Sequence, residues 1–250
     1  MKRRMKPILV AAILVTSIFV AVLIILKRVF PGSAREPDAR QVFEPTRKIM
    51  EAAGRGMGIF LATTAPNAKP LILRLDPKAS TLKTQADEIL ISGLSSAFTN
   101  LAEVATFEYV TMTEQGFRQR AVTGELINRE EFDRAIKRHG DRDLIITLVG
   151  LPSNYRETEP WLQSSPAKPT IVVPFSWTLG RELKKDDFRT IMAIVVVKPD
   201  GVMFKLDDSP QELFDKYLFL VRSENFEDLC EKYRKMGVNA ACSSREEPGP

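Results

Sequence analysis

Three short segments of the chain are apolar at almost every position: residues 144–151, 170–175 and 191–197. A strand with one face in water alternates polar and apolar residues, whereas a strand covered on both faces is a continuous run of Val, Ile and Leu. The three segments therefore predict central strands of a covered sheet. Shorter apolar runs predict further strands at 58–62, 71–75, 105–111 and 217–221.

Helical patterns fall between these strands. Residues 40–53 have spaced apolar positions that predict a helix, and Gly54 is expected to end it. Residues 88–104 place apolar side chains three or four positions apart. This spacing predicts either one interrupted helix or a strand at 89–91 followed by a helix from Ser95.

Capping residues mark the later helices. Asn128 is followed three residues later by Glu131, which is the pattern of a capping box, and Gly140 follows the end of that helix. Ser209 and Ser223 begin two more helices in the same way.

Alternation of strands and helices predicts βαβ units and therefore a three-layer α/β domain with a largely parallel, Rossmann-like sheet. One exception is expected at its edge. Residues 191–197, a turn at 198–201 and residues 202–206 are typical of a β-hairpin, so the sheet should have one antiparallel edge strand.

The segment Pro7 to Leu26 has no charged residue and is flanked by Lys and Arg on both sides. Twenty such residues make a helix of about 30 Å, the thickness of the hydrocarbon core of a bilayer, which makes lipid the expected partner of this segment. A cleavable signal ending at Ala34 is the alternative, although signal cores are shorter. The excess of basic residues before the segment places the N-terminus in the cytoplasm and the following domain outside it.

These features divide the chain into five parts. Residues 1–6 form a cytoplasmic basic N-terminus, 7–26 a single-pass transmembrane anchor, 27–45 a tether, 46–238 one globular α/β domain and 239–250 a disordered tail.

The basic character of the chain belongs to its first part. Residues 1–35 hold seven Lys or Arg and no acidic residue, which leaves 29 basic against 32 acidic side chains in the rest. A nucleic-acid-binding domain carries a basic excess on its folded surface, so nucleic acid is not an expected partner.

Candidate chemistry is sparse. The glycine cluster at 54–58 follows a predicted helix and precedes a predicted strand, the reverse of a phosphate-binding loop, so we interpret it as a helix stop with a turn. The single histidine, His139, is expected at a solvated helix end. Cys230 falls on an apolar helix face as a buried thiol, with a bridge to Cys242 as the alternative. We expect neither a cofactor nor a metal site.

Residues 128–177 are distantly similar to a known family. The capped helix NREEFDRAIKRHG, the strand DLIITLVGLP, the loop SNYRETEPW and the strand TIVVPFSW together resemble a half-lobe of type I periplasmic ligand-binding proteins. The resemblance implies an α/β ligand-binding lobe. About 190 residues between tether and tail leave room for one lobe and part of another.

Ligands of open α/β sheets bind beyond the carboxyl ends of the strands. The residues at or just after predicted strand ends are therefore the candidate ligand-binding residues: Asp76, Ser153, Asn154, Tyr155, Trp161 and Trp177. An aromatic pair over a crevice stacks well on a sugar or a peptide side chain, and packing at the rim of the core is the other interpretation of both tryptophans.

The sequence thus predicts a membrane-anchored, extracytoplasmic module for ligand binding or protein interaction. The alternative is a membrane-tethered hydrolase that uses a pair of carboxylates, for which Glu157 and Glu159 are the candidates. No nucleophile, metal or phosphate motif supports an enzyme, so the binding module is favoured.

Overall fold

A computed structural model describes residues 39–99, 101–123, 125–158, 160, 169–176, 183–198 and 208–235. Contacts divide the chain into residues 1–44 and residues 45–250, and the fold described below is that of the second unit. Within the described ranges no helix is both long and apolar enough to cross a membrane. The predicted anchor at 7–26 lies outside them, as do Val202–Leu206, Trp161 and Trp177.

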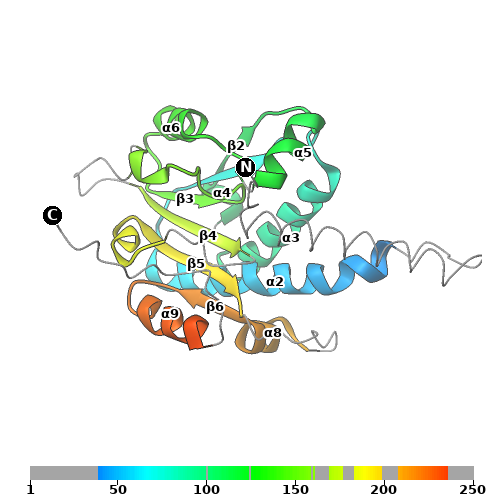
Figure 1. The fold of residues 1–250 in the computed structure, drawn as a ribbon, viewed down its shortest axis with the longest axis vertical. Coiled ribbons are helices and arrows are strands. Elements are labelled where there is room, and N and C mark those ends of the chain that lie inside the picture. Colours follow the sequence, from blue (N-terminus) through cyan, green and yellow to red (C-terminus); the bar gives the residue numbers. More distant parts are fainter. Residues whose placement is uncertain are drawn as a thin grey trace, which may run out of the picture. The chain divides into compact units, whose positions relative to one another are not determined.

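Among the described residues, six strands form one sheet in the order β2-β1-β3-β4-β5-β6 (Figure 1). Their bounds are Pro70–Leu75 for β1, Thr106–Val110 for β2, Leu144–Thr147 for β3, Thr170–Ser176 for β4, Ile191–Val197 for β5 and Leu218–Val221 for β6. The pairs from β2 to β5 are parallel, and β5 and β6 are antiparallel. The predicted mixed α/β class with a largely parallel sheet is confirmed.

Helices and short 3₁₀ turns connect the strands. Their bounds are Ala39–Thr64 for α2, Thr81–Ala97 for α3, Leu101–Val104 for α4, Glu114–Thr123 for α5, Arg129–Arg138 for α6, Tyr155–Glu157 for η1, Lys185–Arg189 for η2, Pro210–Tyr217 for α8 and Phe226–Lys235 for α9. The predicted capping boxes at Asn128 and Ser209 are both formed.

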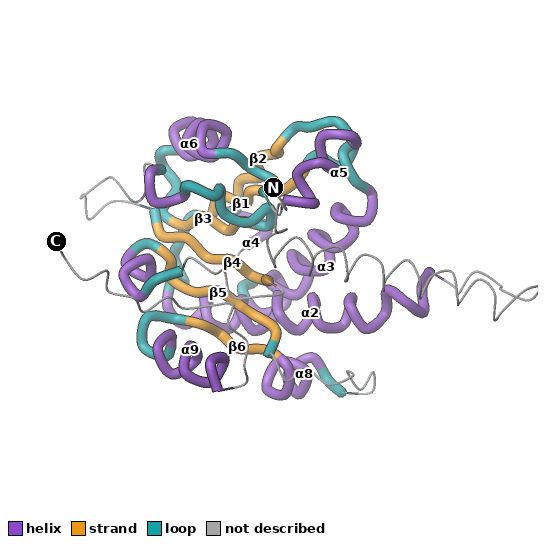
Figure 2. The backbone as a smooth tube through the Cα atoms, viewed as in Figure 1, coloured by secondary structure: helices purple, strands orange, loops and turns teal. Residues whose placement is uncertain are grey.

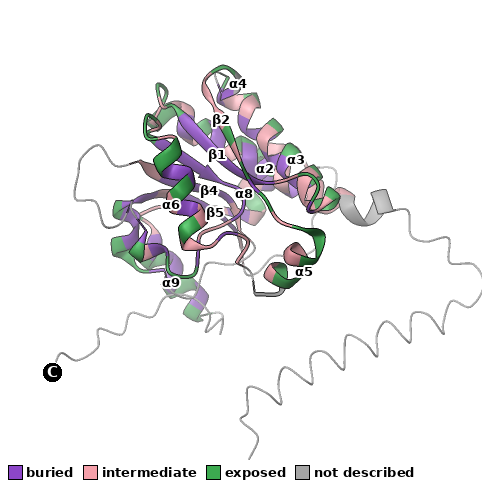
Figure 3. Ribbon diagram, turned by 90° about the horizontal axis from the view of Figure 1, so that it is seen from above, coloured by how far each residue is buried: buried purple, intermediate pink, exposed green. Residues whose placement is uncertain are grey.

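The sheet is covered on both faces, as the continuous apolar runs predict. Ile72, Ile146 and Val172 pack with α2, α3 and α8 on one face. Leu71 and Ile145 lie on the opposite face in a core shared with α6, and the core beneath α9 continues that layer. Figure 3 shows α2 and α3 on one side of the sheet and α6 on the other, so the domain has three layers.

The antiparallel edge strand has a different origin from the predicted hairpin. Its register pairs Ile194 with Val221 and Val197 with Leu218, so β6 lies beside β5 and α8 connects the two strands. The edge pair itself is confirmed. Figure 2 shows β2 and β6 at opposite ends of the sheet.

The glycine cluster lies inside helix α2, and the predicted strand at 58–62 and helix stop at Gly54 are therefore wrong. A Cβ atom at Gly54 would lie 2.3 Å from the carbonyl oxygen of Leu90 in α3, and one at Gly58 would lie 2.5 Å from that of Leu94. Gly93 of α3 meets the backbone of α2 in the same way. The glycines allow the two helices to cross in backbone contact, where any side chain would separate them.

The ambiguous segment before β2 is also resolved. Helix α3 runs from Thr81 to Ala97, with Ser80 accepting a hydrogen bond from the Lys83 amide as N-cap. The alternative strand at 89–91 is wrong because Leu90 belongs to the face of α3 that packs on the core with Leu94.

Candidate functional site

The strand order has one point at which the direction of winding changes. From β1 the chain passes through α3 to β2 on one side, and from β2 it passes through α5 and α6 to β3 on the other side of β1. Ligands of doubly wound sheets bind at this switch point, beyond the carboxyl ends of the two central strands. The loops after Leu75 and Thr147 are therefore the first place to look for a site.

Asp76 lies in the loop after β1, where the sequence placed it. Its amide donates to the carbonyl of Val110 at 3.1 Å, and its Oδ1 accepts from the Lys78 amide at 2.9 Å. This carboxylate therefore shapes the turn that leads into α3.

Lys83 links α3 to the segment that follows β3 and pairs with a buried carboxylate of its own helix. Lys83 donates to the carbonyl oxygen of Leu148 at 2.8 Å and pairs with the carboxylate of Asp87 one turn along the helix. Asp87 is fully buried. Burial raises the pKa of Asp87, and the neighbouring Lys83 ammonium opposes that rise. The pair holds the first turn of α3 against the carboxyl end of the sheet.

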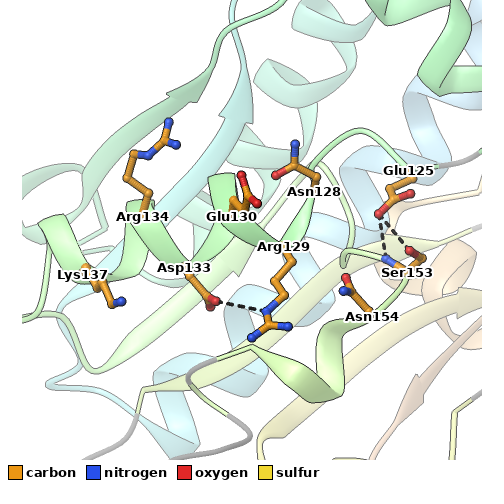
Figure 4. A pocket seen from close by; sticks show the side chains of 9 residues that line it. All are labelled: Glu125, Asn128, Arg129, Glu130, Asp133, Arg134, Lys137, Ser153 and Asn154. Atoms are coloured by element: carbon orange, nitrogen blue, oxygen red, sulfur yellow. Dashed lines mark hydrogen bonds and ion pairs between the residues drawn. The ribbon is translucent and has the colours of Figure 1, made fainter.

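A groove of about 1000 Å³ lies beside the loop after β3. Figure 4 shows it between helix α6 and the turn that precedes η1. Every side chain that lines it is polar or charged: Glu125, Asn128, Arg129, Glu130, Asp133, Arg134, Lys137, Ser153 and Asn154.

Two of the predicted ligand-binding residues line this groove. Ser153 donates to Oε1 of Glu125 through both its amide and its hydroxyl, each at 3.0 Å. Asn154 is exposed, and its amide nitrogen lies 3.4 Å from Oε2 of Glu157. The loop after β3 is thereby fixed to the segment that leads into α6.

The opposite wall comes from helix α6, which sequence reasoning did not assign to the site. Arg129 pairs with Glu157 at 2.8 Å and lies 3.7 Å from Asp133, four residues further along the helix (Figure 4). The signal was present as polar residues four apart on the side of α6 opposite Phe132 and Ile136.

Tyr155, predicted as a ligand-binding residue, is buried and does not line the groove. Its hydroxyl donates to Oδ2 of Asp187 at 2.7 Å, and Arg156 makes a bidentate pair with the same carboxylate at 2.8 and 2.7 Å. The Lys184 amide adds a further bond at 2.7 Å. Burial alone would raise the pKa of Asp187, but these donors outweigh it and lower the pKa. The cluster fixes η1 against η2.

The remaining candidate residues for ligand binding or catalysis are not brought together by the described part of the structure. Trp161, Trp177 and Glu159 lie outside the described residues. Glu157 is paired with Arg129, so the described part of the chain offers no observation that favours the hydrolase alternative. His139 is mostly buried rather than solvated, with Nε2 at 3.1 Å from Oε2 of Glu108.

Cys230 is buried as predicted, but it is disulfide-bonded and not a free thiol. The other cysteine of the chain, Cys242, lies outside the described residues. Across the described ranges no group of His, Cys, Asp and Glu side chains has the geometry of a metal site. The glycine cluster is helical and therefore offers no loop for a phosphate.

Comparison with known proteins gives matches by structure alone. No family model matches the chain, and no curated protein matches it. One solved structure is GanP, a glucose-galactose binding protein from Geobacillus stearothermophilus, with 16% sequence identity and a TM-score of 0.41 over 71% of this chain and 61% of that one. Another is an ABC transporter solute binding protein from Burkholderia graminis in complex with D-arabinose, with 15% identity and a TM-score of 0.39 over 70% and 60% of the two chains. This chain thus spans about three fifths of the length of these structures.

Proposed function

We propose that this chain is a membrane-anchored module whose α/β domain, outside the cytoplasm, binds a small polar ligand in the groove between α6 and the loop after β3. One observation carries the proposal. A groove of about 1000 Å³ lies at the carboxyl end of a central strand, and all of its lining side chains are polar or charged. Its size suits a small molecule, and its position suits a doubly wound sheet.

The lining chemistry favours a ligand rich in hydroxyl groups. Hydroxyls both donate and accept hydrogen bonds, and the groove offers carboxylate acceptors at Glu125 and Asp133, a guanidinium donor at Arg129 and an amide that does both at Asn154. A free monosaccharide is the simplest ligand of this kind. Glucose, galactose and arabinose are the sugars named for the two solved structures, and they are the first that we would test.

The anchor and the location rest on the sequence. The uncharged segment Pro7 to Leu26 has the length of a membrane span, and the basic residues before it favour a cytoplasmic N-terminus. The disulfide at Cys230 suits an oxidising compartment and supports a domain outside the cytoplasm.

Calorimetric titration of the purified full-length chain tests the binding proposal. We expect saturable heat with at least one of D-glucose, D-galactose and D-arabinose. Asp133→Asn should weaken that binding by about 10- to 100-fold, because a hydrogen bond to a charged acceptor contributes about 1.5–3 kcal/mol. Asp228→Asn, the same change at an exposed position of α9, should leave the affinity unchanged. No heat with any sugar would exclude this ligand class, and equal binding by both variants would place the site elsewhere.

Protease protection on sealed vesicles of known sidedness tests the anchor. We expect a full-length chain whose domain is digested only from the extracytoplasmic side. Cleavage after Ala34 would instead make it a released protein, and digestion from the cytoplasmic side would contradict the orientation.

A further inference from the structure

Strand β2 forms one end of the sheet, and β1 is its only neighbour among the described residues (Figure 2). Proteins usually protect such an edge with charged side chains, above all Lys, or with Pro or a bulge. The strand TFEYV has no Lys and no Pro, its single charge at Glu108 is paired with Arg138, and its register with β1 is unbroken from Thr106 to Val110. It carries two exposed aromatic side chains, with Phe107 38% and Tyr109 45% exposed.

The hydrogen-bonding direction of each residue in β2 follows from one contact. The carbonyl of Val110 accepts from the amide of Asp76, in the loop after β1, at 3.1 Å, so the backbone groups of Val110 point toward β1. Backbone groups alternate in direction along a strand, so the amide and carbonyl of Glu108 also point toward β1. Those of Phe107 and Tyr109 point away from the sheet. The residues with outward backbone groups are the same two that expose aromatic rings.

We propose that β2 pairs antiparallel with β2 of a second copy of this chain, about a two-fold axis at Glu108. In this register Phe107 of one copy lies opposite Tyr109 of the other, and each such pair exchanges both backbone hydrogen bonds. All outward backbone groups of the two strands are then used. The same register places the exposed rings in cross-strand aromatic pairs on one face.

The charges at the centre of this interface fit a second copy. Two Glu108 side chains face each other across the axis, an arrangement that repels unless the charge is compensated. Each Glu108 is already held by Arg138 and lies 3.1 Å from Nε2 of His139, both at the end of α6. Two copies therefore bring two guanidinium groups together with the two carboxylates, and the Arg138 side chain is 57% exposed.

The aromatic face is likewise prepared for pairing. The guanidinium of Arg74 lies 5.7 Å from the centre of the Tyr109 ring, directly across the register between β1 and β2. A cation against one face of the ring restrains its orientation before any partner arrives. A single strand pair buries less than the roughly 1,200 Å² of a standard interface, so we expect a reversible dimer.

Cysteine crosslinking of the full-length chain tests the register. Glu108→Cys places two cysteines opposite each other on the axis, where Cα atoms about 4.5–5.5 Å apart allow a disulfide. Thr106→Cys is the matched control, because its two copies lie about 13 Å apart along the strands, beyond the roughly 7 Å limit for a disulfide. We expect a covalent dimer on a non-reducing gel after mild oxidation for Glu108→Cys, and at most a trace for Thr106→Cys.

A second variant separates the proposed pairing from random collision. Tyr109→Lys adds a charge at an exposed edge position and should abolish the crosslink of Glu108→Cys and shift sedimentation equilibrium of the otherwise native chain to monomer. Leu82→Lys, at a 69% exposed apolar position of α3, should change neither. Equal crosslinking at 106 and 108, a crosslink that survives Tyr109→Lys, or a chain that stays monomeric up to millimolar concentration would each overturn the proposal. Far-UV circular dichroism confirms that every variant is folded.

Discussion

Gly54→Ala tests the backbone contact between α2 and α3 directly. The added Cβ would lie 2.3 Å from the carbonyl oxygen of Leu90, whereas ordinary contact begins at 3.4 Å, so the helices must separate by about 1.1 Å. The obstacle is backbone and cannot rotate away. A gap of about 1 Å forfeits up to half of each dispersion contact across the interface.

The expected loss of stability is the cost of overpacking minus the gain in helix propensity. Overpacking costs about 1–3 kcal/mol and occasionally more, and the better helix propensity of Ala returns about 1 kcal/mol. With a backbone obstacle we place the cost at or above the upper end of that range, so the net loss is about 2 kcal/mol or more. For a domain of this size it corresponds to a decrease in Tm of about 4–8 °C.

Urea unfolding followed by far-UV circular dichroism measures this loss. Gly140→Ala is the control, because the atom nearest to its added Cβ is the Lys137 carbonyl oxygen at 3.8 Å. We expect that variant to stay within about 0.5 kcal/mol of the parent chain. If Gly54→Ala proved as stable as the parent chain or more so, the explanation of the glycine cluster as a helix contact would be refuted.

Three further predictions concern buried groups. Lys83→Met leaves the carboxylate of Asp87 buried without its cation, which should cost about 3 kcal/mol in urea unfolding at neutral pH. Because burial raises the pKa of Asp87 in the folded state, this carboxyl contributes most to the free energy of unfolding below about pH 4, where it is protonated, and less as the pH rises. The loss of stability caused by Lys83→Met should therefore shrink in acid. Asp187 behaves oppositely: its lowered pKa predicts that the parent chain exceeds Asp187→Asn in Tm above about pH 4, and that this advantage disappears as the pH falls through the folded-state pKa. Iodoacetamide should label Cys230 in the unfolded chain only after reduction, and labelling without reductant would contradict the disulfide.

The central strands were predictable because a strand buried on both faces is apolar at nearly every position of its sequence. Continuous Val, Ile and Leu runs identified β3, β4 and β5, and capping boxes located α6 and α8. The extent of α2 beyond Gly54 was not predicted, because Gly is the residue that most often follows the end of a helix. Only the positions of α3 and α8 show that these glycines serve tertiary contacts, since Gly54 and Gly58 lie against α3 and Gly56 lies against Phe214 of α8.

The candidate site was half predictable. The rule that ligands bind at strand ends found Ser153 and Asn154, since their place after β3 follows from local pattern. The opposite wall required knowing that α6 lies beside this loop, a relation between segments distant in sequence. Tyr155 satisfied the same rule, yet the partner that buries it, Asp187, is 32 residues away and has no local signal.

The position of β6 has a consequence for how the chain folds during its synthesis. From β4 onward each strand is added beside the one that precedes it in sequence, so this side of the sheet grows in the order of synthesis until β6 ends it. Before Leu218 emerges, the apolar strand β5 presents Val195 and its neighbours as an open edge, the kind of surface on which chains aggregate. The short antiparallel strand thus covers the last open edge of the sheet, and a chain cut ahead of it should aggregate more readily than the longer chain.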